Sequence, residues 1–376
     1  MDLLENKYMN IAIFTPSQNP YSETFIQAHK DYLKGDVFYY YGGRGRVKLE
    51  GQTALVSKTT YLCYRIRRKL HNYSYSYLNE QAILASLKAN QVAVILVEYG
   101  THAFNLQALL RQSGLPVVVH FHGYDASVYE VVSRCHNYQA VFSLASKIIA
   151  VSREMEQTLL ALGCPKDKLV YNVYGPQSEF ESVTPNYAKK QFIGIGRFTD
   201  KKAPYYTIMA FKEVVAKHPD AQLLLAGAGV LLNMCQNLVK HYGIENHVQF
   251  LGVITPESYR HILSESLAFV QHSITASNGD MEGTPLAVLE ASVAGLPVLA
   301  TNHAGIPDVI VHGQTGLLCD EHDVAGMAKH MLEVLDDVAY AQQLGATGKA
   351  HVLEHFSLQR HIETLQHILE QAVTDY

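Results

Sequence analysis

The chain has 376 residues, of which 48% are hydrophobic and 17% are charged, a composition typical of a globular protein long enough for two domains. Its net charge of −5 gives no electrostatic reason to expect a nucleic acid as partner. No apolar run reaches the roughly 20 residues of a membrane-spanning helix, and residues 1–10 do not resemble a signal peptide. The five cysteines are scattered without a C-x-x-C pair, so we expect free thiols and a cytoplasmic location.

Short apolar and β-branched runs alternate with helical patterns along the first half of the chain. The expected strands cover residues 11–15, 37–41, 92–97, 116–121, 147–151 and 168–173. The expected helices between them cover residues 79–89, 104–111, 125–143 and 153–162. Strands that alternate with helices predict a parallel sheet covered on both faces.

The alternation stops at residues 174–186, which are rich in turn formers and predict a linker. It restarts with strands at 192–195, 222–226, 248–251, 267–271 and 297–300, and with helices at 204–217, 231–241, 256–264, 324–336 and from residue 285. We therefore expect an α/β protein with two doubly wound domains, residues 1–180 and 181–355. Residues 356–376 are expected to form a separate amphipathic helix.

Basic residues are concentrated between residues 44 and 69, where the single acid is Glu50. They are Arg44, Arg46, Lys48, Lys58, Arg65, Arg67, Arg68 and Lys69, and tyrosines are interleaved with them. Such a patch fits an anionic membrane surface. A solvated surface helix explains the same pattern equally well, so both interpretations stay open.

Candidate binding loops follow the predicted strands, because open parallel sheets bind ligands outside the carboxyl ends of their strands. These loops are residues 120–123, 194–197, 226–229, 271–273 and 301–305. Two such sheets joined by one linker are expected to face each other across a cleft.

The most informative loop leads into the helix expected from residue 285. Thr284 is expected to cap that helix, with Pro285 at its first position, where the missing N–H costs nothing. The helix is apolar on nearly every side, yet it carries Glu290, and Glu282 precedes it. A lone helical glutamate usually reaches solvent or an arginine. Two carboxylates that bracket a helix N-terminus instead suit a ligand with hydroxyls at both ends and phosphate between them, such as a nucleotide sugar. The candidate donor-binding residues here are Asn278, Asp280, Gly283, Thr284, Pro285, Leu286 and Glu290.

Arg197 and Lys202 lie in one strand-to-helix loop, where both side chains can converge on a diphosphate. Two surface cations would also produce this pattern. The chain has no D-x-D dyad and no His/Cys cluster, so we expect no metal and no other cofactor. Cations and helix-end amides must then neutralise a departing diphosphate.

Two further loops carry weaker signals. The segment 227–229 is half of a dinucleotide-binding fingerprint without its third glycine, so a tight turn at Gly229 below a nucleotide is the better interpretation. His122 lies at a strand end with Gly123 after it, which allows a ligand to approach closely. With 19 histidines in the chain, a structural role for His122 is equally consistent.

In order along the chain, Arg197 with Lys202, Gly229, Glu282 with Glu290, and residues 305–308 resemble the GT-B retaining glycosyltransferases of family 4. Residues 22–26 and 121–125 resemble the exopolysaccharide and colanic-acid branch of that family. The resemblance implies two Rossmann-like domains, with the acceptor bound by the first, the donor by the second, and the last helix returning to the first domain. One departure from the family pattern is Ala203, where glycine often stands.

The resemblance also implies roles for individual residues. Glu290 would hold the ribose hydroxyls and Glu282 the sugar, Arg197 and Lys202 the diphosphate, and His122 would lie by the reacting centre. Acceptor-side residues would be Ser22, Glu23, Thr24 and Asp125.

The candidate residues predict a metal-independent glycosyltransferase, and the resemblance implies that it is a retaining one. It would move a sugar from a UDP- or GDP-type donor to a saccharide or a polyprenyl-diphosphate-linked saccharide, as in the synthesis of bacterial exopolysaccharide, capsule or lipopolysaccharide. The enzyme would be cytoplasmic and peripheral on the membrane. The alternatives are a non-catalytic nucleotide-sugar-binding protein of the same fold and a nucleotide-sugar epimerase.

Overall fold

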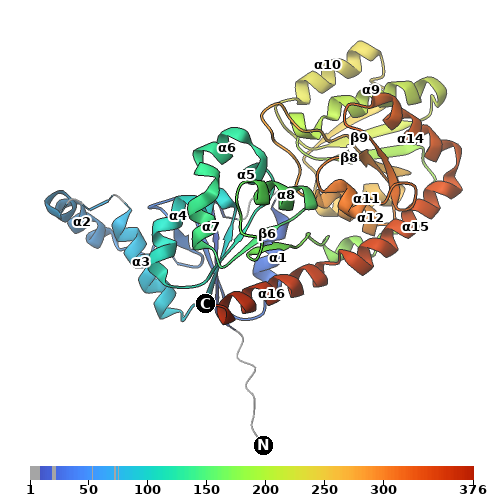
Figure 1. Ribbon diagram of the computed structural model, residues 1–376. Helices are drawn as coiled ribbons and strands as arrows, with labels where there is room; N and C mark the ends of the chain where they lie inside the picture. Colours follow the sequence, from blue (N-terminus) through green and yellow to red (C-terminus); the bar gives the residue numbers. More distant parts are fainter. Residues whose placement is uncertain (1–8, 19–22, 53, 72, 75) are drawn as a thin grey trace, which may run out of the picture. The chain divides into compact units, whose positions relative to one another are not determined.

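The structure is a computed structural model that describes residues 9–18, 23–52, 54–71, 73–74 and 76–376 (Figure 1). The chain forms two compact units. The first contains residues up to Val151, residues 156–172 and residues 362–376, and the second contains residues 152–155 and 173–361. Apart from residues 152–155, the units divide at 172/173 and 361/362. The sequence analysis had placed these two boundaries after residues 180 and 355.

In the described part of the chain, the first unit contains a seven-stranded sheet of order β3-β2-β1-β4-β5-β6-β7. Its strands are β1 (Ile11–Thr15), β2 (Val37–Tyr41), β3 (Lys48–Leu49), β4 (Val94–Glu98), β5 (Val117–His120), β6 (Lys147–Ala150) and β7 (Leu169–Tyr171). All neighbours are parallel except β2 and β3. The apolar strands β1 and β4 are buried along their whole length, as a sheet covered on both faces requires.

Helices join these strands and cover the sheet. They are α1 (Thr24–Tyr32), α2 (Lys58–His71), α3 (Tyr77–Ala89), α4 (Gly100–Ser113), α5 (Tyr124–Ser127), α6 (Tyr129–Arg134), η1 (His136–Tyr138), α7 (Gln139–Leu144), α8 (Arg153–Ala161) and α16 (Leu358–Thr374). The backbone amide of Lys34, just after α1, donates to Gln366 of α16, which ties the last helix to this unit.

The second unit has a six-stranded, fully parallel sheet of order β10-β9-β8-β11-β12-β13 in the described residues. Its strands are β8 (Gln191–Ile195), β9 (Gln222–Ala226), β10 (Val248–Gly252), β11 (Ala268–Gln271), β12 (Val298–Thr301) and β13 (Gly316–Cys319). Its helices are η2 (Ser178–Phe180), η3 (Asp200–Lys202), α9 (Pro204–Lys217), α10 (Leu232–Tyr242), α11 (Pro256–Glu265), α12 (Leu286–Val293), α13 (Ile306–Val309), α14 (Val324–Asp336) and α15 (Val338–His355).

The structure confirms the α/β class and the two parallel-sheet units, and corrects several elements. The single helix expected at 125–143 is broken into α5, α6, η1 and α7. Val128 is extended between α5 and α6, and His136, Asn137 and Tyr138 have φ between 49° and 57° before α7. The pattern analysis missed β3, β13 and α15 altogether. Among the described residues, no helix is both long and apolar enough to cross a bilayer.

Candidate functional site

Each sheet reverses its strand order next to its first strand, and polar residues gather at both of these places. In the second unit the reversal lies between β8 and β11, whose carboxyl ends are Ile195 and Gln271. A small hollow opens there, lined by Gly194, Gly196, Arg197, Lys202, Val270 and Gln271 among others. Such a switch point is where doubly wound sheets bind their ligands.

Lys202 and Glu282 meet at this hollow. Lys202 Nζ lies 3.1 Å from Glu282 Oε1 and 3.4 Å from Gln271 Oε1, and the two charged side chains are mostly buried. Burial favours neutral Glu282, but the Lys202 and Lys201 ammonium groups outweigh it and lower the pKa of Glu282. Burial likewise lowers the pKa of Lys202, while Glu282 opposes that shift. The pair places a lysine cation at the hollow, and Arg197 is exposed beside it.

The turn that carries Lys202 is tight. Residues Asp200–Lys202 form η3, and Ala203 follows with φ of 35°, in the left-handed region that favours glycine. This conformation explains why the resembling family often has glycine at this position. The turn also buries Lys201, whose Nζ lies 2.9 Å from Asp280 Oδ1 and 3.2 Å from the Met281 carbonyl.

The sequence analysis did not predict the role of Lys201, because adjacent lysines in a loop are usually surface cations. Its contacts hold the loop before α12 in place. Asn278 contributes to the same turn, since its Oδ1 accepts the backbone amide of Asp280 at 3.0 Å. The structure therefore brings Asn278 and Asp280 together with Glu282 and Lys202 in one loop cluster.

The expected cap of the helix after this loop is wrong by one residue. Helix α12 begins at Leu286, and Pro285 is its N-cap residue, with ψ of 120° and no side-chain cap. Thr284 is buried in the preceding turn, where the Gly283 carbonyl accepts the Gly305 amide at 3.0 Å. A Cβ on Gly305 would lie 2.2 Å from that carbonyl, so only glycine allows this close approach.

Glu290 is half-buried on α12, and burial raises the pKa of its carboxyl to about 7. Tyr259 of α11 lies nearby, its hydroxyl 3.5 Å from the Ala287 carbonyl. Burial, and then the charge of Glu290, raise the pKa of Tyr259. Within the described residues the structure gives Glu290 no ion pair, so an arginine partner is not found, whereas the alternative of a side chain that reaches solvent fits its partial exposure. A carboxylate held this way gains from a ligand that donates hydrogen bonds to it.

The turn after β9 fits under the Arg197 loop only because it contains glycines. Gly227 has φ of 130°, and a Cβ on it would lie 1.9 Å from the Gly196 carbonyl oxygen. A Cβ on Gly229 would lie 2.4 Å from the Phe198 carbonyl oxygen. The expected tight turn at Gly229 is therefore present.

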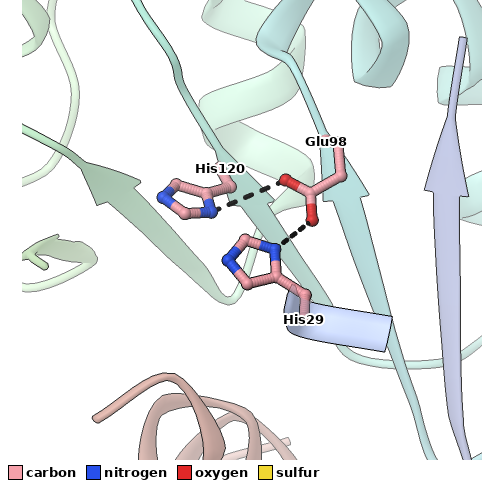
Figure 2. A group of neighbouring side chains, drawn as sticks. All are labelled: His29, Glu98 and His120. Atoms are coloured by element: carbon pink, nitrogen blue, oxygen red, sulfur yellow. Dashed lines mark hydrogen bonds and ion pairs between the residues drawn. The ribbon is translucent and has the colours of Figure 1, made fainter. Parts of the chain in front are cut away.

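The first unit has its own cluster, at the reversal between β1 and β4 (Figure 2). Glu98 ends β4 and is fully buried, with Oε1 2.7 Å from His29 Nδ1 of α1. Its other oxygen lies 2.8 Å from His122 Nε2 and 3.5 Å from His120 Nδ1. Burial would raise the pKa of Glu98, but His29 and His122 hold it well below the usual range. Glu98 is thus an anion shared by imidazoles.

His122 is held in this cluster from several sides. Its side chain is 3% exposed, and its ring lies 4.6 Å from that of Phe25 and 4.5 Å from that of Tyr99. Because a carboxylate can only accept, His122 Nε2 must donate its proton to Glu98.

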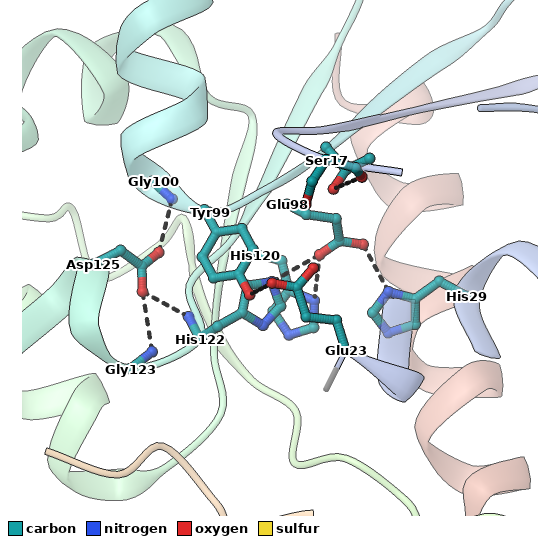
Figure 3. A network of polar contacts seen from close by, with 11 residues as sticks. Ser17, Glu23, His29, Glu98, Tyr99, Gly100, His120, His122, Gly123 and Asp125 are labelled. Atoms are coloured by element: carbon teal, nitrogen blue, oxygen red, sulfur yellow. Dashed lines mark hydrogen bonds and ion pairs between the residues drawn. The ribbon is translucent and has the colours of Figure 1, made fainter. Parts of the chain in front are cut away.

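Asp125 shapes the loop that carries His122 (Figure 3). It is completely buried and accepts the backbone amides of Gly100, His122 and Gly123 at 2.9–3.0 Å. Burial raises the pKa of Asp125, and the His122 imidazole and these amides oppose the rise. A side chain closed off in this way fixes the loop, and the expected acceptor-side role of Asp125 stays a prediction.

The other expected acceptor-side residues lie at the start of α1. Thr24 is its first residue, and Glu23 Oε1 accepts the Tyr99 hydroxyl at 2.6 Å. Tyr99 has φ of 73°, a strained conformation of a kind that often marks functional sites. Ser22 lies outside the described residues.

The cluster around Glu98 was missed from the sequence, where the expected strand stopped one residue short of it. An acid that ends an otherwise apolar strand was the available signal. One ligand atom each from His29, Glu98 and His120 lies within 4.8 Å of the others, as in sites for a divalent ion. Both oxygens of Glu98 already lie at hydrogen-bonding distance from imidazoles, so a cation would have to displace these contacts.

Comparison with known proteins agrees with this architecture. A family model described as "Glycosyl transferases group 1" matches residues 177–351, and one described as "Glycosyltransferase Family 4" matches residues 35–172. The chain belongs to the family 4 glycosyltransferases.

Relatives of this family 4 chain include the amylovoran biosynthesis glycosyltransferase AmsK of Erwinia amylovora, which is 28% identical over 77% of this chain and 72% of its own. A Salmonella typhimurium protein named for colanic acid biosynthesis, WcaL, is 28% identical over 67% of this chain, and the match spans 64% of its own length.

Solved structures share the GT-B fold of this family 4 chain. Anabaena HepE in complex with UDP superposes with a TM-score of 0.75 at 15% identity, covering 96% of this chain and all of HepE. The sucrose-phosphate synthase of Thermosynechococcus elongatus gives a TM-score of 0.74 at 17% identity, over 98% of this chain and all of its own.

Proposed function

We propose that this protein is a retaining, metal-independent glycosyltransferase. Its donor is a UDP- or GDP-linked sugar, and its acceptor is a saccharide or a polyprenyl-diphosphate-linked saccharide. The pathway is the synthesis of a bacterial exopolysaccharide, capsule or lipopolysaccharide in the cytoplasm. The observation that carries the proposal is the hollow at the β8–β11 switch point, which Arg197 and Lys202 line and where Lys202 pairs with Glu282, in a chain of this family.

The donor would bind to the second unit through charges that are already in place. Arg197 is exposed at the hollow and presents a fork suited to a diphosphate, with Lys202 as a second cation. Glu290 would accept the ribose hydroxyls. As the bond between sugar and diphosphate breaks, negative charge grows on the leaving phosphate, and these cations with the first amides of α12 stabilise it.

His122 would act on the sugar from the first unit. Glu98 accepts a hydrogen bond from His122 Nε2 and so fixes the orientation of the imidazole, which would contact the donor sugar or the acceptor hydroxyl. The acceptor hydroxyl would attack on the face from which the diphosphate departs, giving retention. The names of AmsK and WcaL, which refer to exopolysaccharide synthesis, support the acceptor class.

A thermal-shift panel of UDP, GDP and their common sugar conjugates tests the donor class. Stabilisation by one base, lost in Glu290→Gln, supports the proposal. No stabilisation by any nucleotide overturns it.

Exposed basic residues of the first unit, on and near β3 and α2, motivate a second proposal, that the enzyme docks on anionic membrane. Arg46, Lys48 and Arg65 are exposed, and Tyr61 and Leu62 of α2 are exposed with them. Each basic residue near such a surface contributes about 1 kcal/mol, weakened by salt. Sedimentation with phosphatidylglycerol vesicles should show binding that salt and Arg46→Glu/Lys48→Glu/Arg65→Glu weaken. If the triple variant and the native protein sediment alike, this face is only solvated.

A further inference from the structure

The loop that carries Glu282 is clamped by two residues outside the candidate donor set. This donor loop, residues 272–285, joins β11 to α12. The clamping residues come from the next two strands along the sheet, since His303 follows β12 and Glu321 follows β13. Because both residues follow the carboxyl ends of neighbouring strands, they come into contact with the donor loop.

Glu321 holds the beginning of the donor loop. Its Oε2 accepts the Thr275 amide at 2.8 Å, and its Oε1 lies 3.2 Å from Thr275 Oγ1. Oε1 also lies 2.5 Å from His303 Nδ1. Burial would raise the pKa of Glu321, but the Thr275 amide and the His303 imidazole lower it. Glu321 is therefore an anion that accepts from both residues.

His303 holds the end of the donor loop. Its side chain is 1% exposed, and its Nε2 lies 3.2 Å from the backbone nitrogen of Glu282. A backbone amide can only donate, so Nε2 must carry a lone pair. The ring proton is then on Nδ1 and is donated to Glu321. The contacts at both ring nitrogens thus require one neutral tautomer.

We infer that His303 and Glu321 are positioning residues that place Glu282 beside Lys202 for the donor sugar. This role rests on the proposed function. One carboxylate, Glu321, fixes Thr275 directly and fixes Glu282 through His303, so both ends of the donor loop depend on it. The opposite tautomer or a doubly protonated ring would set an N–H of His303 against the N–H of Glu282 and release the loop.

Variants at His303 separate positioning from packing. His303→Gln keeps an acceptor oxygen within reach of the Glu282 amide, whereas His303→Leu keeps bulk and removes the acceptor. We expect His303→Leu to lower kcat/KM by about 10- to 100-fold, the scale for a displaced catalytic group. His303→Gln should recover most of that loss. UDP or GDP affinity, to which Glu290 and Arg197 outside the donor loop contribute, should fall much less than kcat/KM in both variants.

Glu321→Gln tests whether both acceptor oxygens of Glu321 are needed to hold the donor loop. Glutamine has one acceptor oxygen in place of two, so it cannot accept from both the Thr275 amide and His303 Nδ1. One end of the donor loop is then released, and kcat/KM should fall as in His303→Leu. His330→Leu is the matched control, because His330 is a buried histidine on α14 of the same unit whose Nε2 contacts the Leu318 carbonyl. It should lower the melting temperature without changing kcat.

The tautomer can be measured without any activity. In ¹⁵N-histidine NMR spectra of the ligand-free full chain near neutral pH, His303, assigned by its loss in His303→Gln, should show a protonated Nδ1 and an unprotonated Nε2. An Nε2–H tautomer or an imidazolium overturns the inference, as does His303→Leu with native kcat/KM. A native protein that shows the expected tautomer but transfers no sugar would instead overturn the proposed function.

Discussion

Glu290 should make the protein less stable and its nucleotide complex tighter at the same time. Burial raises the pKa of this carboxyl to about 7, against about 4.3 for an ordinary glutamate. The folded state therefore prefers the protonated form. The cost of ionising Glu290 begins as pH rises above its unfolded pKa, grows to about pH 7 and is constant above that value. Replacing Glu290 by glutamine removes the charge with little change of shape.

The full shift of pKa corresponds to about 3–4 kcal/mol. Glu290 is only half-buried, so solvent reduces the cost to roughly 1–3 kcal/mol. Glu290→Gln should raise the free energy of unfolding by this amount near pH 8.5 and hardly at all near pH 4, below the unfolded pKa, where the carboxyl is largely protonated in both the folded and the unfolded states. The same variant should bind the preferred nucleoside diphosphate about 1.5–3 kcal/mol more weakly, because a charged hydrogen bond to the ribose is lost.

Urea unfolding at the two pH values and calorimetric titration with UDP and GDP measure both effects. Glu213→Gln is the matched control, an exposed glutamate on α9 whose loss should change neither quantity. Weaker unfolding stability in Glu290→Gln near pH 8.5 would refute the burial argument. Unchanged nucleotide affinity would mean that Glu290 does not contact the ribose.

Three further perturbations test the two clusters. Arg197→Ala should lower kcat/KM by roughly 10²–10³, the scale for losing one charge-stabilising group. The control Lys212→Ala, which removes an exposed lysine of α9, should not lower it. Native activity should survive EDTA. Loss of transfer in EDTA that magnesium restores would contradict the metal-independent clamp. His122→Ala should lower kcat strongly but leave nucleotide Kd unchanged, whereas the buried control His102→Ala should lower only the melting temperature; a native kcat in His122→Ala would remove it from the mechanism. Glu98→Gln should cost about 3–5 kcal/mol of unfolding free energy near pH 7, because it breaks a buried charge network. Since the folded pKa of Glu98 is depressed, this difference should shrink as pH falls below about 4.3, and a constant difference from pH 7 to pH 3 would count against an ionised Glu98.

Local pattern was enough to predict the parallel core of both sheets, but not their edge strands β3 and β13. Strands such as β1 and β4 are continuous apolar runs, and helical patterns between them require parallel crossovers. The loops after β8 and β11 were likewise predictable, because ligand sites follow strand carboxyl ends. Lys202 and Glu282 belong to these loops, and the structure brings them within 3.1 Å.

The supporting residues could not be predicted because their partners are distant in sequence. His29 and Glu98 are 69 positions apart and meet only because β4 pairs beside β1. His303 reaches Glu321 only because β12 pairs with β13, a strand that the pattern analysis missed. The break at residues 136–138 depends on positive φ values at His136, Asn137 and Tyr138, which propensity does not foresee.

Sugar transfer itself tests the central claim most directly. The full chain would be incubated in EDTA with UDP- or GDP-sugar, radiolabelled in the sugar and chosen from the thermal-shift panel, and with polyprenyl-diphosphate-linked saccharides from a bacterial membrane extract. The account predicts label in the lipid-linked fraction, with the anomeric configuration of the donor retained by NMR, and loss of that transfer in Arg197→Ala. A protein that binds the donor but leaves it intact would instead be a binding protein, and one that inverts a sugar stereocentre without any acceptor would be an epimerase. Either result would contradict the account.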